Sequence, residues 1–349
     1  MKGDKVKAFI IADSHTGTLR PTEVPAPPPP GNDQVQLELI GTSINPIDPL
    51  VAKGYGAPLL DRKGPGARIT GRDAVARVIE VGKGVTDLRP GQRVLVAASP
   101  RTGGTYAAIF NLPRKCVAPI DDSLSDATAA GLGYAGLTAL QALAAAGLSA
   151  DNARGKQLCI NGASGGVGSI ALVLARRWGA TITAVASERN QDWVRRLGAD
   201  QTVDYRDPAA MAAIDTDIIL NFAAPGDNHR QDPLLDRLRR RDTPGRAYVN
   251  TTNPVLSSVT DKGVVGGLAT SGGIYLKKRL AAGRAGIRYR WVLFKEDAEQ
   301  LAYLAKVFAD PNTPTIVSYS QPLDALPDAF NDPKGAPSPG KAVFMVDAP

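Results

Sequence analysis

Residues 158–168, Leu-Cys-Ile-Asn-Gly-Ala-Ser-Gly-Gly-Val-Gly, decide the fold class of the chain. They form the end of an apolar stretch at 156–162, a glycine-rich turn, and the start of a helix expected over 167–178. A second apolar stretch follows at 181–186. Strand, glycine-rich turn, helix and strand in this order let backbone N–H groups and the positive end of a helix bind a pyrophosphate. The sequence therefore predicts a dinucleotide-binding unit, with a merely tight turn as the alternative.

Outward from this stretch, short apolar segments alternate with helical ones. Further strands are expected at 201–205, 217–223 and 246–252, a helix at 192–197, and another helix near 297–308. This alternation is typical of a parallel sheet covered by helices on both faces. The preceding part of the chain instead predicts a small β-rich unit, with strands at 5–11, 34–40, 74–81 and 92–97. A further β-like segment is expected at 341–346. The proline-rich residues 21–30 are expected to be an extended connector between strands.

Composition limits the classes of protein that fit. The chain has 349 residues, of which 43% are hydrophobic and 21% charged, so it is long enough for two domains and too apolar to be disordered. With two Cys and two His in total, a disulfide scaffold is excluded, and a structural zinc site would need all four residues. We expect both cysteines, Cys116 and Cys159, to be reduced thiols.

No stretch of the sequence reads as a membrane span or a leader. Residues 127–150 are uncharged, but they consist mostly of Ala and Gly, so a helix packed inside the protein is favoured. The start of the chain runs directly into a strand-like segment. We therefore expect a cytoplasmic protein, with an organellar form whose leader has been removed as the alternative.

The net charge of +7 is concentrated in one window. Residues 276–295 contain seven Lys and Arg and no Asp or Glu. A nucleic-acid binder usually adds stacking aromatics or a reading motif, so we expect no nucleic-acid partner. A solvated surface segment and a patch facing an anionic cofactor remain the alternatives.

The dinucleotide is predicted to be NADPH. An NAD site usually has Asp or Glu near the end of the second strand, whereas Val185 and Ala186 stand there. Ser187 and Arg189 could donate hydrogen bonds to a 2′-phosphate. Glu188 between them is discordant with this prediction, because it is an acidic residue near the end of the strand. The remaining cofactor candidates are the residues of the turn and two residues near the ends of later strands: Ala163, Ser164, Gly165, Gly166, Val167, Gly168, Tyr205 and Asn221.

Several stretches together resemble the medium-chain dehydrogenase/reductase superfamily, and within it the zinc-free quinone oxidoreductases, most closely the reticulon-4-interacting protein group of NADPH oxidoreductases. The matching stretches are SINPIDPLVAKGYG (43–56), GRDAVARVIEVG (71–82), GTYAAIF (104–110), INGASGGVGS (160–169), VRRLGADQTVDYR (194–206) and GIRYRWVLF (286–294). The resemblance implies an α/β protein with a GroES-like β-rich catalytic domain over 1–125 and 295–349 and a Rossmann, doubly wound parallel-sheet NADPH-binding domain over 126–294. A homodimer is left open.

The resemblance also implies the activity. The positions that hold catalytic zinc in related alcohol dehydrogenases correspond here to Asn45, Arg72, Asp73 and Leu132, a set that does not suit a metal. Hydride transfer without a metal to a quinone or an activated alkene is therefore expected. An enoyl-thioester reductase, whose anionic carrier the basic window could bind, and a non-catalytic NADPH-binding scaffold are the alternatives.

Tyr55 and Asn45 are candidates for the reaction itself, and Lys341 is a further cofactor candidate. Tyr55, between two glycines, could give a proton or a hydrogen bond to the acceptor, or be a plain loop aromatic. Asn45 could orient the nicotinamide or the acceptor oxygen, or form an Asx turn before Pro46. Lys341 follows Gly340 at a position that the family often places near the cofactor, with a surface lysine as the alternative.

Overall fold

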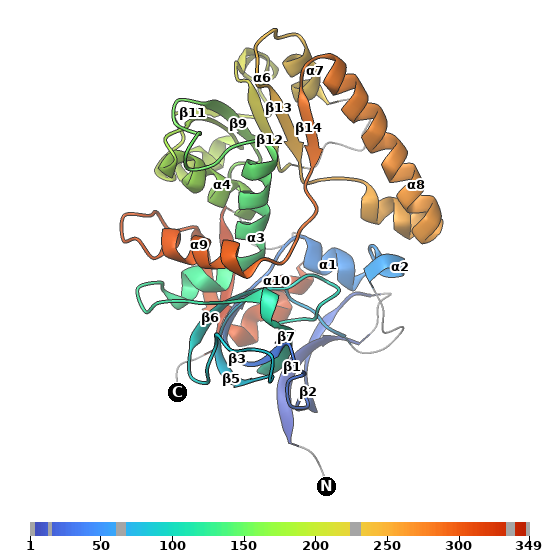
Figure 1. Cartoon of the computed structure of the whole chain (residues 1–349), viewed down its shortest axis with the longest axis vertical. Helices are drawn as coiled ribbons and strands as arrows, with labels where there is room; N and C mark the ends of the chain where they lie inside the picture. The colour runs from blue at the N-terminus through green and yellow to red at the C-terminus, as the bar shows by residue number, and fades with distance from the viewer. Residues whose placement is uncertain (1–3, 13–15, 61–67, 224–231, 333–338, 347–349) are drawn as a thin grey trace. The chain divides into compact units, whose positions relative to one another are not determined.

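The computed structural model describes residues 4–12, 16–60, 68–223, 232–332 and 339–346 (Figure 1). The two histidines, His15 and His229, lie outside these residues. The chain divides into two compact units. The first unit comprises Met1–Leu137 and Phe294–Pro349, and the second comprises Thr138–Leu293. Each is described by itself.

The second unit is built on a six-stranded parallel sheet with the order β11-β10-β9-β12-β13-β14. Its strands are β9 (Gln157–Asn161), β10 (Thr181–Val185), β11 (Gln201–Val203), β12 (Ile218–Asn221), β13 (Ala247–Asn250) and β14 (Arg288–Trp291). In chain order this is 3-2-1-4-5-6, the strand order of dinucleotide-binding sheets. The direction of winding reverses between β9 and β12, where such sheets bind their ligand.

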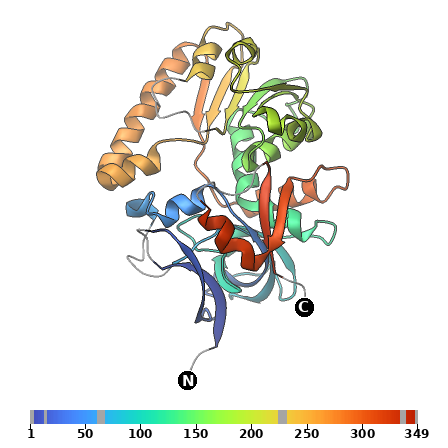
Figure 2. The ribbon, with the colours of Figure 1, turned by 180° about the vertical axis from the view of Figure 1, so that it is seen from behind.

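Helices follow most of these strands, because parallel strands need a crossover connection. They are α4 (Gly166–Arg177), α5 (Gln191–Arg196), α6 (Pro208–Ala213), α7 (Pro233–Arg239) and α8 (Val255–Arg284), with a 3₁₀ turn η2 at Glu188–Asn190. Apolar side chains of α7 and α8 pack on one face of the sheet, against Cys159, Tyr248 and Tyr289 among others. Figures 1 and 2 both show α8 as a long helix beside the edge strand β14.

The first unit is mainly β-structure. A seven-stranded sheet contains β3 (Gln34–Ser43), β5 (Asp73–Val81), β6 (Arg93–Ala97), β7 (Ile109–Pro113), β8 (Val117–Pro119), β15 (Val317–Pro322) and β16 (Lys341–Met345). A three-stranded sheet contains β1 (Lys5–Ile11), β2 (Leu19–Pro25) and β4 (Arg68–Ile69). The C-terminal strand β16 pairs with β3, which brings the two ends of this unit's sequence into one sheet.

Short helices complete the first unit. They are α1 (Ile47–Ala52), α2 (Ala57–Leu60), η1 (Arg114–Cys116), α9 (Ala298–Phe308), η3 (Leu323–Ala325) and α10 (Leu326–Asn331). The helix α3 (Asp126–Ala145) contains the sequence boundary between the units. The mixed α/β class with a β-rich and a parallel-sheet part is thus confirmed. No helix in the described ranges is long and apolar enough to span a membrane.

Two segments differ from the expectations. The first prolines of 21–30 do not connect strands but belong to β2, at the edge of the three-stranded sheet. Proline is tolerated there because an edge strand needs only half of its backbone hydrogen bonds. The long helix α8 was not expected, because six glycines between 263 and 283 weaken both helix propensity and the apolar period.

Candidate functional site

The glycine-rich turn lies between β9 and α4 in the second unit. Gly162 has a φ of 79°, and a Cβ there would lie 2.9 Å from the backbone nitrogen of Ala223. A Cβ on Gly168 would lie 2.2 Å from the carbonyl oxygen of Gly162. Both positions therefore require glycine, for different reasons: the backbone conformation and close backbone contact at Gly162, and close backbone contact at Gly168.

The N-terminus of α4 faces this turn. The N-cap residue, Gly165, offers no side chain to accept hydrogen bonds from the first turn of the helix. Those N–H groups and the helix dipole thus keep their capacity to bind an anion. Together with the position of the turn beside the β9/β12 reversal, this fits the pyrophosphate of a dinucleotide.

The segment after β10 is tied to the turn. The carbonyl oxygen of Val185, the last residue of β10, accepts hydrogen bonds from the backbone N–H groups of Gly162 and Ala163, at 3.2 and 3.1 Å. The Asn190 amide donates to the hydroxyl of Ser164 at 3.2 Å. Ser187 and Arg189, which lie between these anchors in sequence, are half-buried and exposed, respectively. Both are therefore held next to the glycine-rich turn.

The discordant Glu188 is also exposed. Its backbone N–H donates to the carboxylate of Asp204 at 3.1 Å, and that carboxylate also accepts from Arg206. Hydrogen bonds from Arg206 lower the pKa of Asp204. The predicted Tyr205 is 57% exposed, and the Arg206 guanidinium lies 5.6 Å from its ring centroid. Arg206 is thus a further cation near the end of β10 that the sequence reasoning did not single out.

Asn221 lies at the point where the winding of the sheet reverses. It is opposite Asn161 in the parallel register of β9 and β12, and the Asn161 amide donates to its side-chain oxygen at 2.9 Å. The Asn221 amide donates in turn to the Tyr248 hydroxyl at 2.8 Å, and that hydroxyl donates to Asp232. Burial, with the nearby Asp232, raises the pKa of Tyr248 well above its usual range. This chain of hydrogen bonds fixes the two asparagines at the point where the winding of the sheet reverses.

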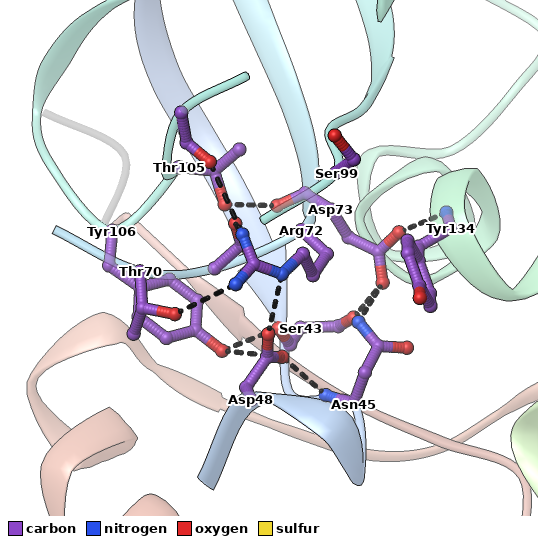
Figure 3. Close-up of polar contacts among 12 residues, drawn as sticks. Ser43, Asn45, Asp48, Thr70, Arg72, Asp73, Ser99, Thr105, Tyr106 and Tyr134 are labelled. Atoms are coloured by element: carbon purple, nitrogen blue, oxygen red, sulfur yellow. Dashed lines mark hydrogen bonds and ion pairs between the residues drawn. The ribbon is translucent and has the colours of Figure 1, made fainter. Parts of the chain in front are cut away.

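In the first unit, a buried polar cluster forms around Asp73 (Figure 3). One carboxylate oxygen, Oδ2, accepts from the Ser43 hydroxyl at 2.6 Å, the Asn45 amide at 2.8 Å and the Lys341 ammonium at 3.0 Å. The other oxygen accepts from the backbone N–H of Tyr134. Lys341 also donates to the Asn45 side-chain oxygen at 2.7 Å. We call these five residues the Asp73 cluster.

This cluster bears on two alternatives, a surface position for Lys341 and an Asx turn formed by the Asn45 side chain. The alternative of a surface position for Lys341 is wrong, because the residue is 3% exposed and its ammonium contacts Asp73 and Asn45. The Asn45 amide likewise contacts Asp73 and Lys341, whereas the backbone N–H of Asn45 is held by the carboxylate of Asp48 at 2.8 Å. The turn before α1 is therefore fixed by Asp48.

A second ion pair lies beside the Asp73 cluster. The Arg72 side chain points to Asp48, with 3.3 Å between Nε and Oδ1, and its other nitrogens donate to the oxygens of Gly71, Gly103 and Thr70. The Tyr106 hydroxyl donates to the carbonyl oxygen of Ser43 at 3.0 Å and lies 3.3 Å from Asp48.

The two ion pairs leave the buried region formally neutral, with two carboxylates and two cations. Burial raises the pKa of Asp48, although Arg72 opposes the shift. Burial also raises the pKa of Tyr106 well above its usual range and that of Tyr134 to about 12. Sequence reasoning missed Tyr106 and Ser43, since a single Tyr or Ser carries no motif.

The positions that the resemblance assigns to the zinc site of alcohol dehydrogenases hold groups that do not suit a metal. Asn45 and Asp73 share the Lys341 ammonium, Arg72 brings a second positive charge, and Leu132 is fully buried and has no donor atom. Among the described residues, no group of three or more His, Cys, Asp or Glu could hold a metal ion.

Tyr55 follows α1 in the first unit. It is half-buried, its backbone N–H donates to the carbonyl oxygen of Leu50 at 3.0 Å, and its neighbours Gly54 and Gly56 have φ values of 88° and 74°. These positive φ angles explain the glycines on either side. The turn thus holds Tyr55 in a half-buried position, and its side chain is not part of the buried polar region.

Comparisons with known proteins agree with this architecture. Residues 31–145 match the family model of the alcohol dehydrogenase GroES-like domain. The chain is 30% identical over 326 residues to the mouse protein "NAD(P)H oxidoreductase RTN4IP1, mitochondrial", with 90% of this chain and 82% of that protein covered. It is 39% identical over 196 residues to the Arabidopsis thaliana "Chloroplast envelope quinone oxidoreductase homolog", with 56% and 59% covered.

A solved structure shows the same fold. The quinone oxidoreductase from Coxiella burnetii superposes with a TM-score of 0.78 at 24% sequence identity. The match covers 99% of this chain and 100% of that one.

Proposed function

Because the chain belongs to the medium-chain dehydrogenase/reductase superfamily, in the NAD(P)H oxidoreductase group of the reticulon-4-interacting proteins, we propose that it is a zinc-independent, NADPH-dependent oxidoreductase that reduces a quinone or an activated alkene. The observation that carries the zinc-independent part is the contact of the Lys341 ammonium with Asn45 and Asp73, at 2.7 and 3.0 Å. A protein cation there takes the oxygens that a metal would need.

The second unit supplies the cofactor site in this proposal. The turn residues 163–168 hold the pyrophosphate, and Ser187 and Arg189 bind the 2′-phosphate. Asn221 and Tyr205 line the same edge of the sheet. NADPH, when bound, supplies the hydride, and the protein orients it.

The first unit supplies the acceptor site in this proposal. Hydride addition builds negative charge on the acceptor oxygen, and a hydrogen-bond donor stabilises that charge. Tyr55 is the proposed donor, with its phenol outside the buried polar region. Asn45 keeps one amide hydrogen beyond its bond to Asp73, so it is the proposed orienting group. Lys341 and Asp73 position Asn45.

Turnover with a panel of acceptors tests the proposed function. We expect NADPH oxidation with a quinone or an enone. Oxidation with enoyl thioesters alone would identify an enoyl-thioester reductase instead, and NADPH binding without turnover of any acceptor would identify a scaffold.

We expect NADPH to bind at least about tenfold more tightly than NADH, which corresponds to about 1.4 kcal/mol. Arg189→Ala should weaken NADPH binding and leave NADH binding nearly unchanged, because only NADPH carries the 2′-phosphate. Fluorescence titration measures both dissociation constants. Arg240→Ala, at another exposed arginine of the second unit, is the matched control. Equal dissociation constants for the two nucleotides in the unmodified protein would refute the assignment.

Location and assembly remain predictions. A cytoplasmic location is the expectation from the sequence, whereas the names of the mouse and Arabidopsis relatives place those proteins in mitochondria and the chloroplast envelope. A homodimer is proposed from the family alone.

A further inference from the structure

The helix α8 carries an exposed apolar stripe that neither the fold nor the proposed reaction uses. Its residues are Val265, Ala269, Gly272, Leu276 and Leu280, and their spacing of three or four residues places them on one side of the helix. Val265 is 84% exposed, and Leu276 and Leu280 are each 54% exposed. A Cβ on Gly272 would meet nothing within 4 Å. We call these five residues the outer face of α8.

The opposite side of α8 holds the helix on its unit. The Tyr275 ring packs against this unit's core, with its centroid 6.0 Å from that of Tyr289 and 5.0 Å from that of Trp291. Ala282 is fully buried in the same core. The helix is thus held on its unit by residues that do not belong to the outer face, while Leu276 and Leu280 each keep 54% of their surface exposed.

Cations border the outer face on both sides. With 3.6 residues per turn, Arg279 lies on one side of Leu276, and Lys277 and Arg284 lie on the other. All three are exposed. No Asp or Glu occurs in the sequence between Asp261 and Glu296, so this stretch of α8 carries cations and no acidic residue. An occupant of this face must therefore offer apolar contact in the middle and negative charge at the borders.

We propose that the outer face of α8 docks on an anionic lipid surface, with its leucines and valine among the acyl chains and the bordering cations at the headgroups. An amphipathic helix with this pattern binds membranes by lying in the interface. A second copy of the chain fits less well, because pairing two outer faces brings like charges together. A nucleic acid would satisfy the cations and leave the leucines exposed to water. The proposal is independent of the reductase activity.

Vesicle co-sedimentation of the full chain tests the proposal, using phosphatidylcholine vesicles with and without phosphatidylserine. We expect binding only to the anionic vesicles and its loss at high salt. Lys277→Gln with Arg284→Gln should weaken binding by about fivefold for each cation. Leu276→Ser with Leu280→Ser should weaken it by at least about tenfold.

Matched surface variants serve as controls: Lys83→Gln for charge and Leu50→Ser, at a leucine that is 48% exposed, for apolar contact. Unchanged melting temperatures and NADPH binding show that each variant is folded. Absence of binding to anionic vesicles, or equal binding to both kinds, would overturn the proposal. A second result would also overturn it: the leucine variants leave vesicle binding unchanged and convert a dimer to a monomer in analytical ultracentrifugation. The outer face of α8 would then join two copies of the chain.

Discussion

Replacing Lys341 with Met should lower the free energy of unfolding by about 3–5 kcal/mol, the usual cost of removing one partner of a buried ion pair. The Lys341 side chain is 3% exposed, and its ammonium donates to both Asp73 and Asn45. Methionine has a similar length but no charge, so Asp73 would remain buried with only neutral donors. Denaturant unfolding followed by circular dichroism measures the loss.

Two further variants make this result specific. Lys83→Met, at an exposed lysine of the same unit, should change stability by less than about 0.5 kcal/mol. Lys341→Met combined with Asp73→Asn should recover part of the loss, because the unpaired charge disappears. A single Lys341→Met variant as stable as the Lys83 control would show that the ammonium is not buried against Asp73.

Tyr55→Phe should lower kcat for the best acceptor by about 10²-fold, the usual effect of losing one hydrogen-bond donor that acts in the transition state. NADPH binding should not change, because Tyr55 is not among the proposed cofactor residues. Steady-state kinetics and fluorescence titration separate the two effects.

Tyr319→Phe is the matched control, since it removes a hydroxyl from another half-buried tyrosine of the first unit. We expect it to keep the unmodified rate. If Tyr55→Phe also kept that rate, the proton would come from water or another residue, and the proposed role of Tyr55 would be refuted.

Local sequence was sufficient to predict the elements around the glycine-rich turn. The strand expected at 156–162 is β9, Gln157–Asn161, and the helix expected at 167–178 is α4, Gly166–Arg177. Apolar runs and glycines act within a few residues, so they are visible in the sequence. The helix α8 was missed because its glycines hide the helical period, and its contacts with the second unit's core through Tyr275 and Ala282 are not visible in the local sequence.

The buried polar region could be predicted only in part. Asn45, Asp73 and Lys341 were singled out by the family resemblance, but their mutual contacts were not foreseen. Lys341 and Asp73 are 268 positions apart and meet only because β16 and β5 both pair with β3. Such contacts depend on sheet topology, which the local sequence pattern does not contain. The roles of Tyr55 and Arg189 remain predictions.

The central claim, metal-free reduction by NADPH, is tested most directly by anaerobic NADPH oxidation with a quinone before and after exhaustive chelation. We predict repeated turnovers at the same rate in both samples, with NADH much less effective at low concentration. A rate that disappears on chelation and returns with added zinc would contradict the account.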